Sequence, residues 1–380
     1  MLKKKFIIGT LILLVIIAFL ESYDVRGVEE LSYVIAIGID VSEENENNII
    51  LTVQVATTKP QESGGTSSLE TNLLSVETDS IGLGFNILNT LSTNELNLSH
   101  CSAIVFSEEL AKKGIEPHFD NLANNIEIRP TATIIVANNT AQEFLVSTSE
   151  SEDISADFYN SFIESSETTS YIPDASLSSF YSALHDDVIQ PSCVYGFSDG
   201  SNIENIGLAA FKGDKYIGRL SGIQTIIHNI LTNKLDSATL SLLSPIDNKS
   251  IINIKLSLAK NTDINISYNE STKIPNIECS INLEGKILSA ATNYAFNNSD
   301  DLNRLKMAIN NKIAYETNNY LKKISYEYNS DIVGFFGYLK RHFLTYDELK
   351  NIKWDESFKN ATFNINSNIE LTSNYLFPRI

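Results

Sequence analysis

Cysteine is scarce in this sequence, with only Cys101, Cys193 and Cys279 among 380 residues. No two of them form a C-x-x-C pair, so the chain carries no signature of a structural zinc site or a thiol redox motif. An odd number of widely spaced cysteines also argues against a disulfide framework. One disulfide would fit the count, but we predict buried free thiols.

Signatures of enzyme active sites are also missing. There is no Gly-x-Ser-x-Gly elbow, no HExxH motif and no phosphate loop, because Gly285-Lys286 is followed by Ile287 rather than Ser or Thr. Gly82-x-Gly84 is not a dinucleotide fingerprint, since Ile87 occupies the position of the third glycine. We therefore predict a non-enzymatic protein with no catalytic residue, no metal ligand and no cofactor.

Histidine leaves two weaker alternatives open. The histidines are scattered, and none has a second histidine at ligand spacing. They are His100, His118, His185, His228 and His342. His185-Asp186-Asp187 is the best cluster for a metal or a general base, but its place between a predicted helix and strand favours a polar loop. His100 and Cys101 are adjacent, and adjacent strand residues point to opposite faces, which disfavours a reactive pair.

Positive charge is scarce too. The chain has 28 Lys and Arg against 47 Asp and Glu, a net charge of −19. Such a chain lacks the basic surface that nucleic acids require, so we predict no nucleic-acid partner. An anionic membrane surface would also repel it, so membrane contact has to come from a hydrophobic anchor.

Such an anchor stands at the start of the chain, which we assign as residues 1–20. Lys3-Lys4-Lys5 precede the uncharged run Phe6–Leu20, as in an export signal, and the lysines place the rest of the chain outside the membrane. At about 1.5 Å per residue the run spans roughly 22 Å, which is short for a bilayer core of about 30 Å. Snorkelling lysines and local thinning can cover this difference. A small-residue cleavage site is poor, so we predict an uncleaved anchor, with a cleaved signal as the alternative. The anchor residues are Phe6, Ile7, Leu11, Leu14, Ile17 and Leu20.

The segment 21–198 predicts an α/β-type domain. Its strands and helices alternate, which is typical of a layered fold around a mixed sheet. We expect strands at 31–40, 49–57, 102–106 and 131–137, and helices at 81–91, 108–113, 116–129, 153–166 and 176–185. Val188–Phe197 contains Pro191 and is predicted to be an irregular or edge segment.

The remaining chain predicts two further domains. Residues 199–250 form a small middle domain, with a hairpin at 206–220 and a helix at 223–231 that opens on the capping box Ser221-x-x-Gln224. Residues 251–380 contain strands at 251–260, 263–268, 277–288 and 361–372, and helices at 300–328 and 332–343. The long helix carries an apolar stripe that we expect to pack on its own sheet. The predicted fold class is therefore α+β and multidomain, with three domains that each pack helices on a mixed or antiparallel sheet.

Five motifs occur in the order expected of one known family. They are Gly38-Ile39-Asp40; Ser107–Ile115 with Glu127–Thr131; Gly207–Lys215; Asp331–Phe335; and Trp354–Phe358. Together they resemble the C subunits of spore germinant receptors, the Ger(x)C family, over nearly the whole chain.

The resemblance implies a non-catalytic subunit on the outer face of the spore inner membrane. It implies assembly with two polytopic membrane subunits, of the A and B type, and a role in the response to nutrient germinants. It does not imply that this subunit itself binds the small-molecule germinant.

One position departs from the family pattern. Members usually carry a lipidated cysteine before an aromatic-Asp pair, and here Ser22 precedes Tyr23-Asp24. Serine cannot form the thioether, so we predict no lipidation and a tether through Phe6–Leu20. The competing hypothesis is a membrane-anchored solute-binding protein or hydrolase with a pocket near His185.

Overall fold

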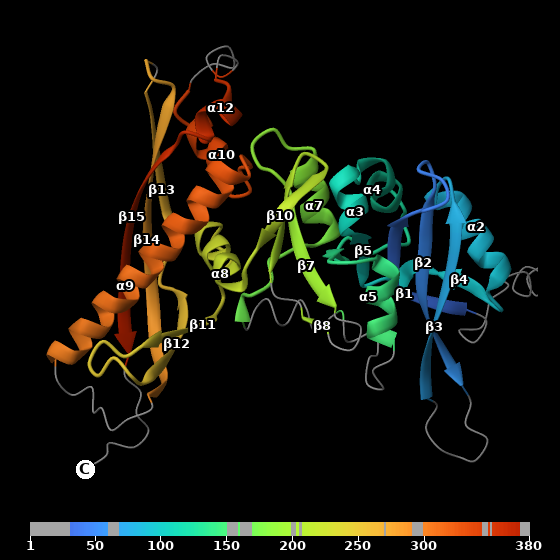
Figure 1. Cartoon of the computed structure of the whole chain (residues 1–380), viewed down its shortest axis with the longest axis horizontal. Coiled ribbons are helices and arrows are strands. Elements are labelled where there is room, and N and C mark those ends of the chain that lie inside the picture. The colour runs from blue at the N-terminus through green and yellow to red at the C-terminus, as the bar shows by residue number, and fades with distance from the viewer. Residues whose placement is uncertain are drawn as a thin grey trace, which may run out of the picture.

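The fold consists of two β-sheets that lie side by side along the long axis of the molecule (Figure 1). A computed structural model describes residues 31–59, 68–149, 159, 169–198, 203–204, 207–269, 271–290, 299–343, 349 and 352–372. The predicted anchor, Ser22 and most of the predicted helix 153–166 lie outside the described residues.

The first sheet is mixed and ten-stranded, in the order β10-β9-β7-β6-β5-β1-β2-β3 with β4 beside β1 and β8 beside β7. Its strands are β1 (Leu31–Val41), β2 (Ile49–Lys59), β3 (Ser68–Thr78), β4 (Glu95–Asn97), β5 (Ala103–Ser107), β6 (Thr133–Ala137), β7 (Ser192–Ser198), β8 (Ile203–Glu204), β9 (Leu208–Lys212) and β10 (Lys215–Leu220). The central strands β1, β5, β6 and β7 run parallel, whereas the hairpins β2–β3 and β9–β10 continue the sheet with antiparallel pairs.

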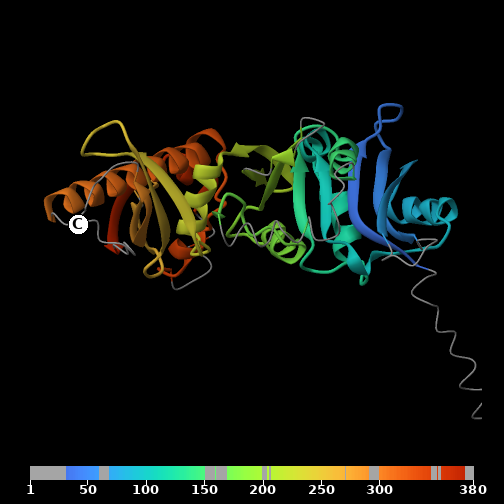
Figure 2. The same ribbon diagram turned by 90° about the horizontal axis from the view of Figure 1, so that it is seen from below.

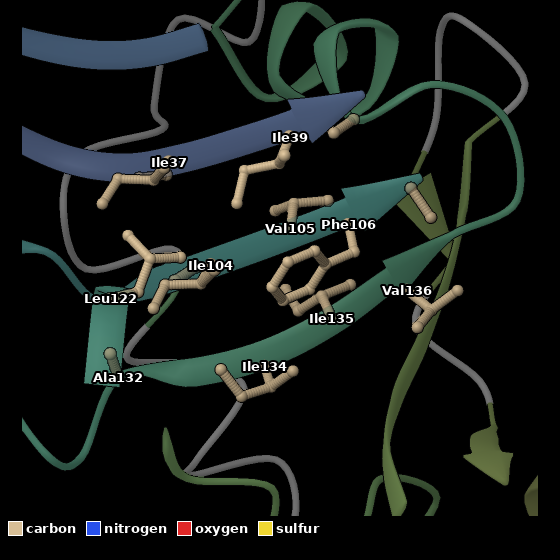
Figure 3. Packing of buried hydrophobic residues seen from close by; sticks show 14 of the residues in the cluster. Ile37, Ile39, Ile104, Val105, Phe106, Leu122, Ala132, Ile134, Ile135 and Val136 are labelled. Atoms are coloured by element: carbon tan, nitrogen blue, oxygen red, sulfur yellow. The ribbon is translucent and has the colours of Figure 1, made fainter. Parts of the chain in front are cut away.

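The parallel strands at the centre are buried on both faces. Every residue of β5 and β6 is buried, and their apolar side chains point to both sides (Figure 3). Strands that are buried on both faces read as continuous apolar runs rather than as alternating ones. The runs AIVFS and TIIVA in the sequence have this property.

Helices cover both faces of the first sheet. They are α2 (Ile81–Leu91), α3 (Glu108–Lys113), α4 (Glu116–Ala123), α5 (Ala141–Ser149) and α7 (Leu177–Leu184), with a 3-10 turn at Leu98–His100. Helix α5 packs so closely on β1 that a Cβ at Gly38 would come within 2.9 Å of Leu145. On the opposite face, Gly84 of α2 lies against Leu51 of β2.

The second sheet has five strands, β11 (Ala238–Leu243), β12 (Ile251–Leu258), β13 (Asp263–Asn269), β14 (Ile274–Ala290) and β15 (Thr362–Thr372). One face carries helices α8 (Gly222–Leu231) and α9 (Ser299–Lys322), and α9 continues into a π-helical turn at Lys323–Glu327. Short helices α10 (Phe335–Lys340) and α12 (Trp354–Phe358) lie beside one end of the sheet (Figure 1). The alternating burial along β13 and β15 shows that the other face is open to water.

Strand β9 contributes to both hydrophobic cores. Ala209 and Phe211 pack into the core of the first sheet, whereas Leu208 and Ala210 pack into the core of the second. Because neighbouring strand residues point to opposite faces, one strand can form a wall of both cores. The view from below shows the hairpin β9–β10 between the two halves (Figure 2).

The predicted division at residues 198 and 250 stays a prediction. Strand pairing places the hairpin at the edge of the first sheet, while β11 pairs within the second sheet and α8 contributes to the second core. Helix α9 buries the predicted stripe against its own sheet: Leu305, Ile309, Ile313 and Tyr320 are fully buried.

The prediction for 188–197 is wrong from Ser192 onward. Residues 188–191 are irregular, but Ser192–Ser198 forms β7, an interior strand between the parallel β6 and the antiparallel β9. Pro191 directly precedes the strand, so its missing N–H removes no donor from the ladder, and its carbonyl accepts from Phe211 N at 3.1 Å. The predicted helix 332–343 is confirmed only over Phe335–Lys340, since Gly334 has a positive φ of 82° just before it.

We expect Phe211→Ala to lower the free energy of unfolding by about 3–5 kcal/mol, as for other buried phenylalanines. Phe211 is fully buried against the ring of Phe180, with centroids 5.1 Å apart. Denaturant unfolding followed by circular dichroism measures the loss. Leu243→Ala, at a site that is 61% exposed, is the control and should change stability by less than about 0.5 kcal/mol. Equal losses in the two variants would contradict this role of β9.

Candidate functional site at the junction of the two sheets

The cluster His185-Asp186-Asp187 forms a surface loop after α7. His185 Nε2 lies 3.5 Å from Asp120 Oδ1, and both side chains are more than one third exposed. Asp186 Oδ1 accepts from the backbone N–H of Val188 at 2.8 Å, so this carboxylate stabilises the local turn of the chain. Among the described residues, no group of three His, Cys, Asp or Glu side chains could hold a metal ion.

His100 and Cys101 do not face each other. Cys101 is fully buried and its Sγ donates to Ala103 O, whereas the ring of His100 packs edge-on against Tyr33 with centroids 4.8 Å apart. Burial raises the pKa of the Cys101 thiol to about 12, which keeps it protonated and unreactive. All three cysteines are buried free thiols, as the sequence predicts.

A hollow of about 560 Å³ lies elsewhere, where the end of α9 meets α12 and β15. Its lining is Asn318, Lys322, Ser325, Tyr326, Glu327, Lys359, Asn360, Ala361, Thr362 and Phe363. These residues include two lysines and Glu327 but no histidine, cysteine or aspartate. The hydroxyl of Ser325, the serine of the lining, donates to the backbone carbonyl of Leu321 at 2.7 Å.

The most strongly organised polar group is Asp331, just after the π-helical turn. Its Oδ1 accepts from the backbone N–H groups of Gly334 at 2.9 Å and Phe335 at 3.0 Å. Its Oδ2 accepts from Phe336 N at 2.9 Å and from the indole Nε1 of Trp354 at 3.0 Å. The carboxylate therefore caps the start of α10 and ties it to α12.

Burial dominates the titration of Asp331. It raises the pKa of the carboxyl from an ordinary value of 3.8 to about 6, although the four hydrogen bonds act in the opposite direction. Nothing around it forms a catalytic constellation, since its partners are three backbone amides and an indole.

The hairpin β9–β10 is bound to the same region. Lys212 Nζ forms an ion pair with Asp355 Oδ2 at 3.0 Å and donates to Asn329 O at 3.0 Å. Ser330 Oγ donates to Phe211 O, and Gln190 N donates to Asp331 O at 3.0 Å. Three of the five sequence motifs therefore meet where the two sheets join.

Close backbone approach reinforces this junction. The hydroxyl of Tyr328 donates to Arg219 O at 2.7 Å, with its ring against Gly218. A Cβ at Gly218 would come within 2.6 Å of the Tyr328 ring. Glycine at this position lets the ring of Tyr328, which follows the π-helical turn, rest directly on β10.

The other two motifs also position secondary structure. Asp40 is buried and accepts from Ala141 N at 2.6 Å and Gln142 N at 2.9 Å, so it caps α5, although burial raises its pKa. Ser107 caps α3, as predicted, with Oγ accepting from Leu110 N at 3.3 Å. At the far end of α3, Ile115 N donates to Asp214 O in the hairpin turn at 3.1 Å.

His228 is one of the scattered histidines for which the sequence predicts no role, and it is buried. His228 of α8 lies in the second core with Nδ1 2.8 Å from the hydroxyl of Tyr320 on α9. Burial lowers its pKa from 6.5 to about 3, so it is neutral at physiological pH. The pairing of Asp331 with Trp354 was also missed, although both residues stand inside motifs that the sequence shows.

Comparison with known families gives two consecutive matches. Residues 24–195 match the family described as spore germination protein N-terminal domain. Residues 206–374 match the family described as spore germination B3/GerAC like, C-terminal.

Individual relatives agree with these matches. Spore germination protein GerQC of Bacillus cereus is 18% identical over 74% of this chain and 76% of its own length. Spore germination protein KC of Bacillus subtilis is 29% identical over 38% of this chain and 36% of its own length. The crystal structure of the GerBC protein superposes with a TM-score of 0.56 at 18% identity, covering 91% of this chain and 99% of that one. This last likeness shows that the α+β fold is shared.

We expect Asp331→Asn to lower the free energy of unfolding by about 1–3 kcal/mol, because an amide NH₂ would face two buried donors. The loss should be largest at acid pH. Since the pKa is raised on folding, the contribution of Asp331 is full below about pH 4 and is lost as the pH rises through about 6. Unfolding at pH 4.5 and 7.5 measures this, with Lys353→Ala, at an exposed residue just before α12, as control. Parallel pH profiles for wild type and Asp331→Asn would contradict the assignment.

His228 should have the opposite pH dependence. Its depressed pKa means that its contribution is full above about pH 6.5 and is lost as the pH falls toward about 3. We expect His228→Gln to make stability less sensitive to acid between pH 6.5 and 4.5. Tyr320→Phe removes the partner hydroxyl but keeps the imidazole, so it should retain the acid sensitivity. If Tyr320→Phe also lost it, the hydrogen bond rather than protonation would be responsible.

Proposed function

The chain belongs to the Ger(x)C family of spore germination proteins, and on this basis we propose that it is the extracytoplasmic C subunit of a spore nutrient germinant receptor. The observation that carries the proposal is the pair of consecutive family matches over residues 24–195 and 206–374. On this proposal the subunit assembles with two polytopic membrane subunits and contributes to the trigger of germination.

The proposed role is non-catalytic. The buried acids of the motifs accept hydrogen bonds from backbone amides and an indole, and they hold helices in place. His185, the centre of the alternative hydrolase or solute-binding hypothesis, pairs with Asp120 on the surface. No observation specifically favours that alternative.

Membrane attachment is proposed to come from the segment 6–20. Within the described ranges, no helix is both long and apolar enough to cross a bilayer. By the positive-inside rule, the lysines before the apolar run support an orientation in which the folded chain lies outside the membrane. The membrane in this proposal is the spore inner membrane.

A pull-down tests the proposal directly. A C-terminal affinity tag is placed on the full chain, spore membranes are solubilised in detergent, and the bound proteins are identified by mass spectrometry. We expect two multi-span membrane proteins to be recovered with it, and an untagged strain serves as the control. Recovery of the protein alone in the soluble fraction would contradict the assignment.

The tether is tested separately. Because Ser22 cannot form a thioether, we expect no incorporation of radioactive fatty acid, and we expect an N-terminal peptide in which Ser22 is still joined to the apolar run. Incorporation of the label would contradict the uncleaved anchor without affecting the receptor assignment.

A further inference from the structure

Among the described strands, β15 forms an open edge of the second sheet. It pairs in parallel with β14 from Asn276 to Lys286. The same stretch of β14 pairs with β12 and β13, so those two strands occupy its other side. Within the described ranges no strand pairs with the outer side of β15, and Figure 1 shows it as the outermost strand.

This edge lacks the features that usually prevent strand addition. Its sequence, TFNINSNIELT, has no proline, no lysine and no arginine, and Glu370 is its one charged residue. The register with β14 runs through eleven consecutive pairs without a bulge. Protected edge strands normally carry prolines, charges or bulges, so this edge is suited to accept another strand.

The apolar side chains of β15 are incompletely covered. Phe363, Ile365 and Leu371 pack against the second core but are only partly buried, whereas Ile369 is buried. A further strand beside β15 would complete their burial and continue the core.

The sequence of β15 identifies the strand that fits. The sequence of β15 is nearly a palindrome about Ser367. If two copies pair antiparallel about a two-fold axis at Ser367, apolar residues lie opposite apolar residues and polar residues lie opposite polar residues. The pairs would be Phe363 with Leu371, Ile365 with Ile369, Thr362 with Thr372, Asn364 with Glu370, and Asn366 with Asn368. No like charges face each other, although the whole chain has a net charge of −19.

We propose that β15 pairs antiparallel with β15 of a second copy of this chain, so that the two C-terminal sheets join into one continuous sheet. A two-fold interface uses the same patch on both copies, which a palindromic strand satisfies. Helix α9 lies over the same axis, because Asn310 Oδ1 accepts from Ser367 Oγ at 3.3 Å. Met307, one turn earlier on α9, is 64% exposed and would lie beside the second copy.

A charge exchange tests the pairing. Asn366 and Asn368 are exposed, so charges there should not disturb the fold. In the full chain, Asn366→Lys/Asn368→Lys places lysine opposite lysine twice, and Asn366→Glu/Asn368→Glu does the same with glutamate. We expect each variant to lose self-association by about tenfold, and the two variants mixed with different tags to recover it. Association in detergent is measured by two-tag co-purification and analytical ultracentrifugation, with thermal unfolding as the check on folding.

Cysteine cross-linking tests the register. Asn366→Cys mixed with Asn368→Cys should form a disulfide-linked dimer, since the three native thiols are buried. Ser241→Cys on the opposite edge strand β11, mixed with Asn366→Cys, should not. Three results would overturn the proposal. The wild type could be monomeric, the mixed charge variants could fail to restore association, or β15 could cross-link to a different protein instead.

Discussion

The alternation of side chains along β9 is the constraint that joins the two halves of this molecule. Odd-numbered residues of the strand pack into the first core and even-numbered residues into the second, so neither core is complete without the hairpin. Replacing one of these apolar residues with a polar one would place an unpaired polar group directly in one of the two cores. The elements around the hairpin, from the end of α9 to α12, bind it through backbone carbonyls, an ion pair and a tyrosine hydroxyl.

The motifs that identify the family have structural tasks at these contacts. Asp40 and Asp331 are buried acids that satisfy helix N-terminal amides, and the indole of Trp354 completes the set around Asp331. Burying a carboxylate without hydrogen-bond partners costs free energy of folding. The helices that supply these partners are therefore held in a fixed position against the buried acids. A protein built in this way presents a defined surface to other proteins, which agrees with the proposed receptor role.

Local patterns in the sequence predicted much of the fold. The hairpin β1–β2, the capped helix α3, the capping box of α8 and the stripe of α9 each follow from short-range rules, and the structure confirms them. The prediction of an irregular or edge segment at 188–197 fails because a proline weakens a strand only when it lies inside the hydrogen-bonded ladder. Pro191 lies just before β7, and the sequence alone does not show where the strand begins. The contact between Asp331 and Trp354 joins residues 23 positions apart, and no local pattern encodes such a pairing. The open edge of β15 likewise depends on a parallel pairing with β14 that only the three-dimensional structure reveals.

Native-state hydrogen exchange tests most directly whether the two sheets form one body. If they do, the amides of Phe335 and Phe336, which donate to Asp331, exchange with the same free energy as the central amides of β5 and β14. A common value would mean that the junction opens only when both cores unfold. Markedly faster exchange at Phe335 and Phe336, with β5 and β14 opening at different free energies, would mean that the halves unfold independently and would contradict the account.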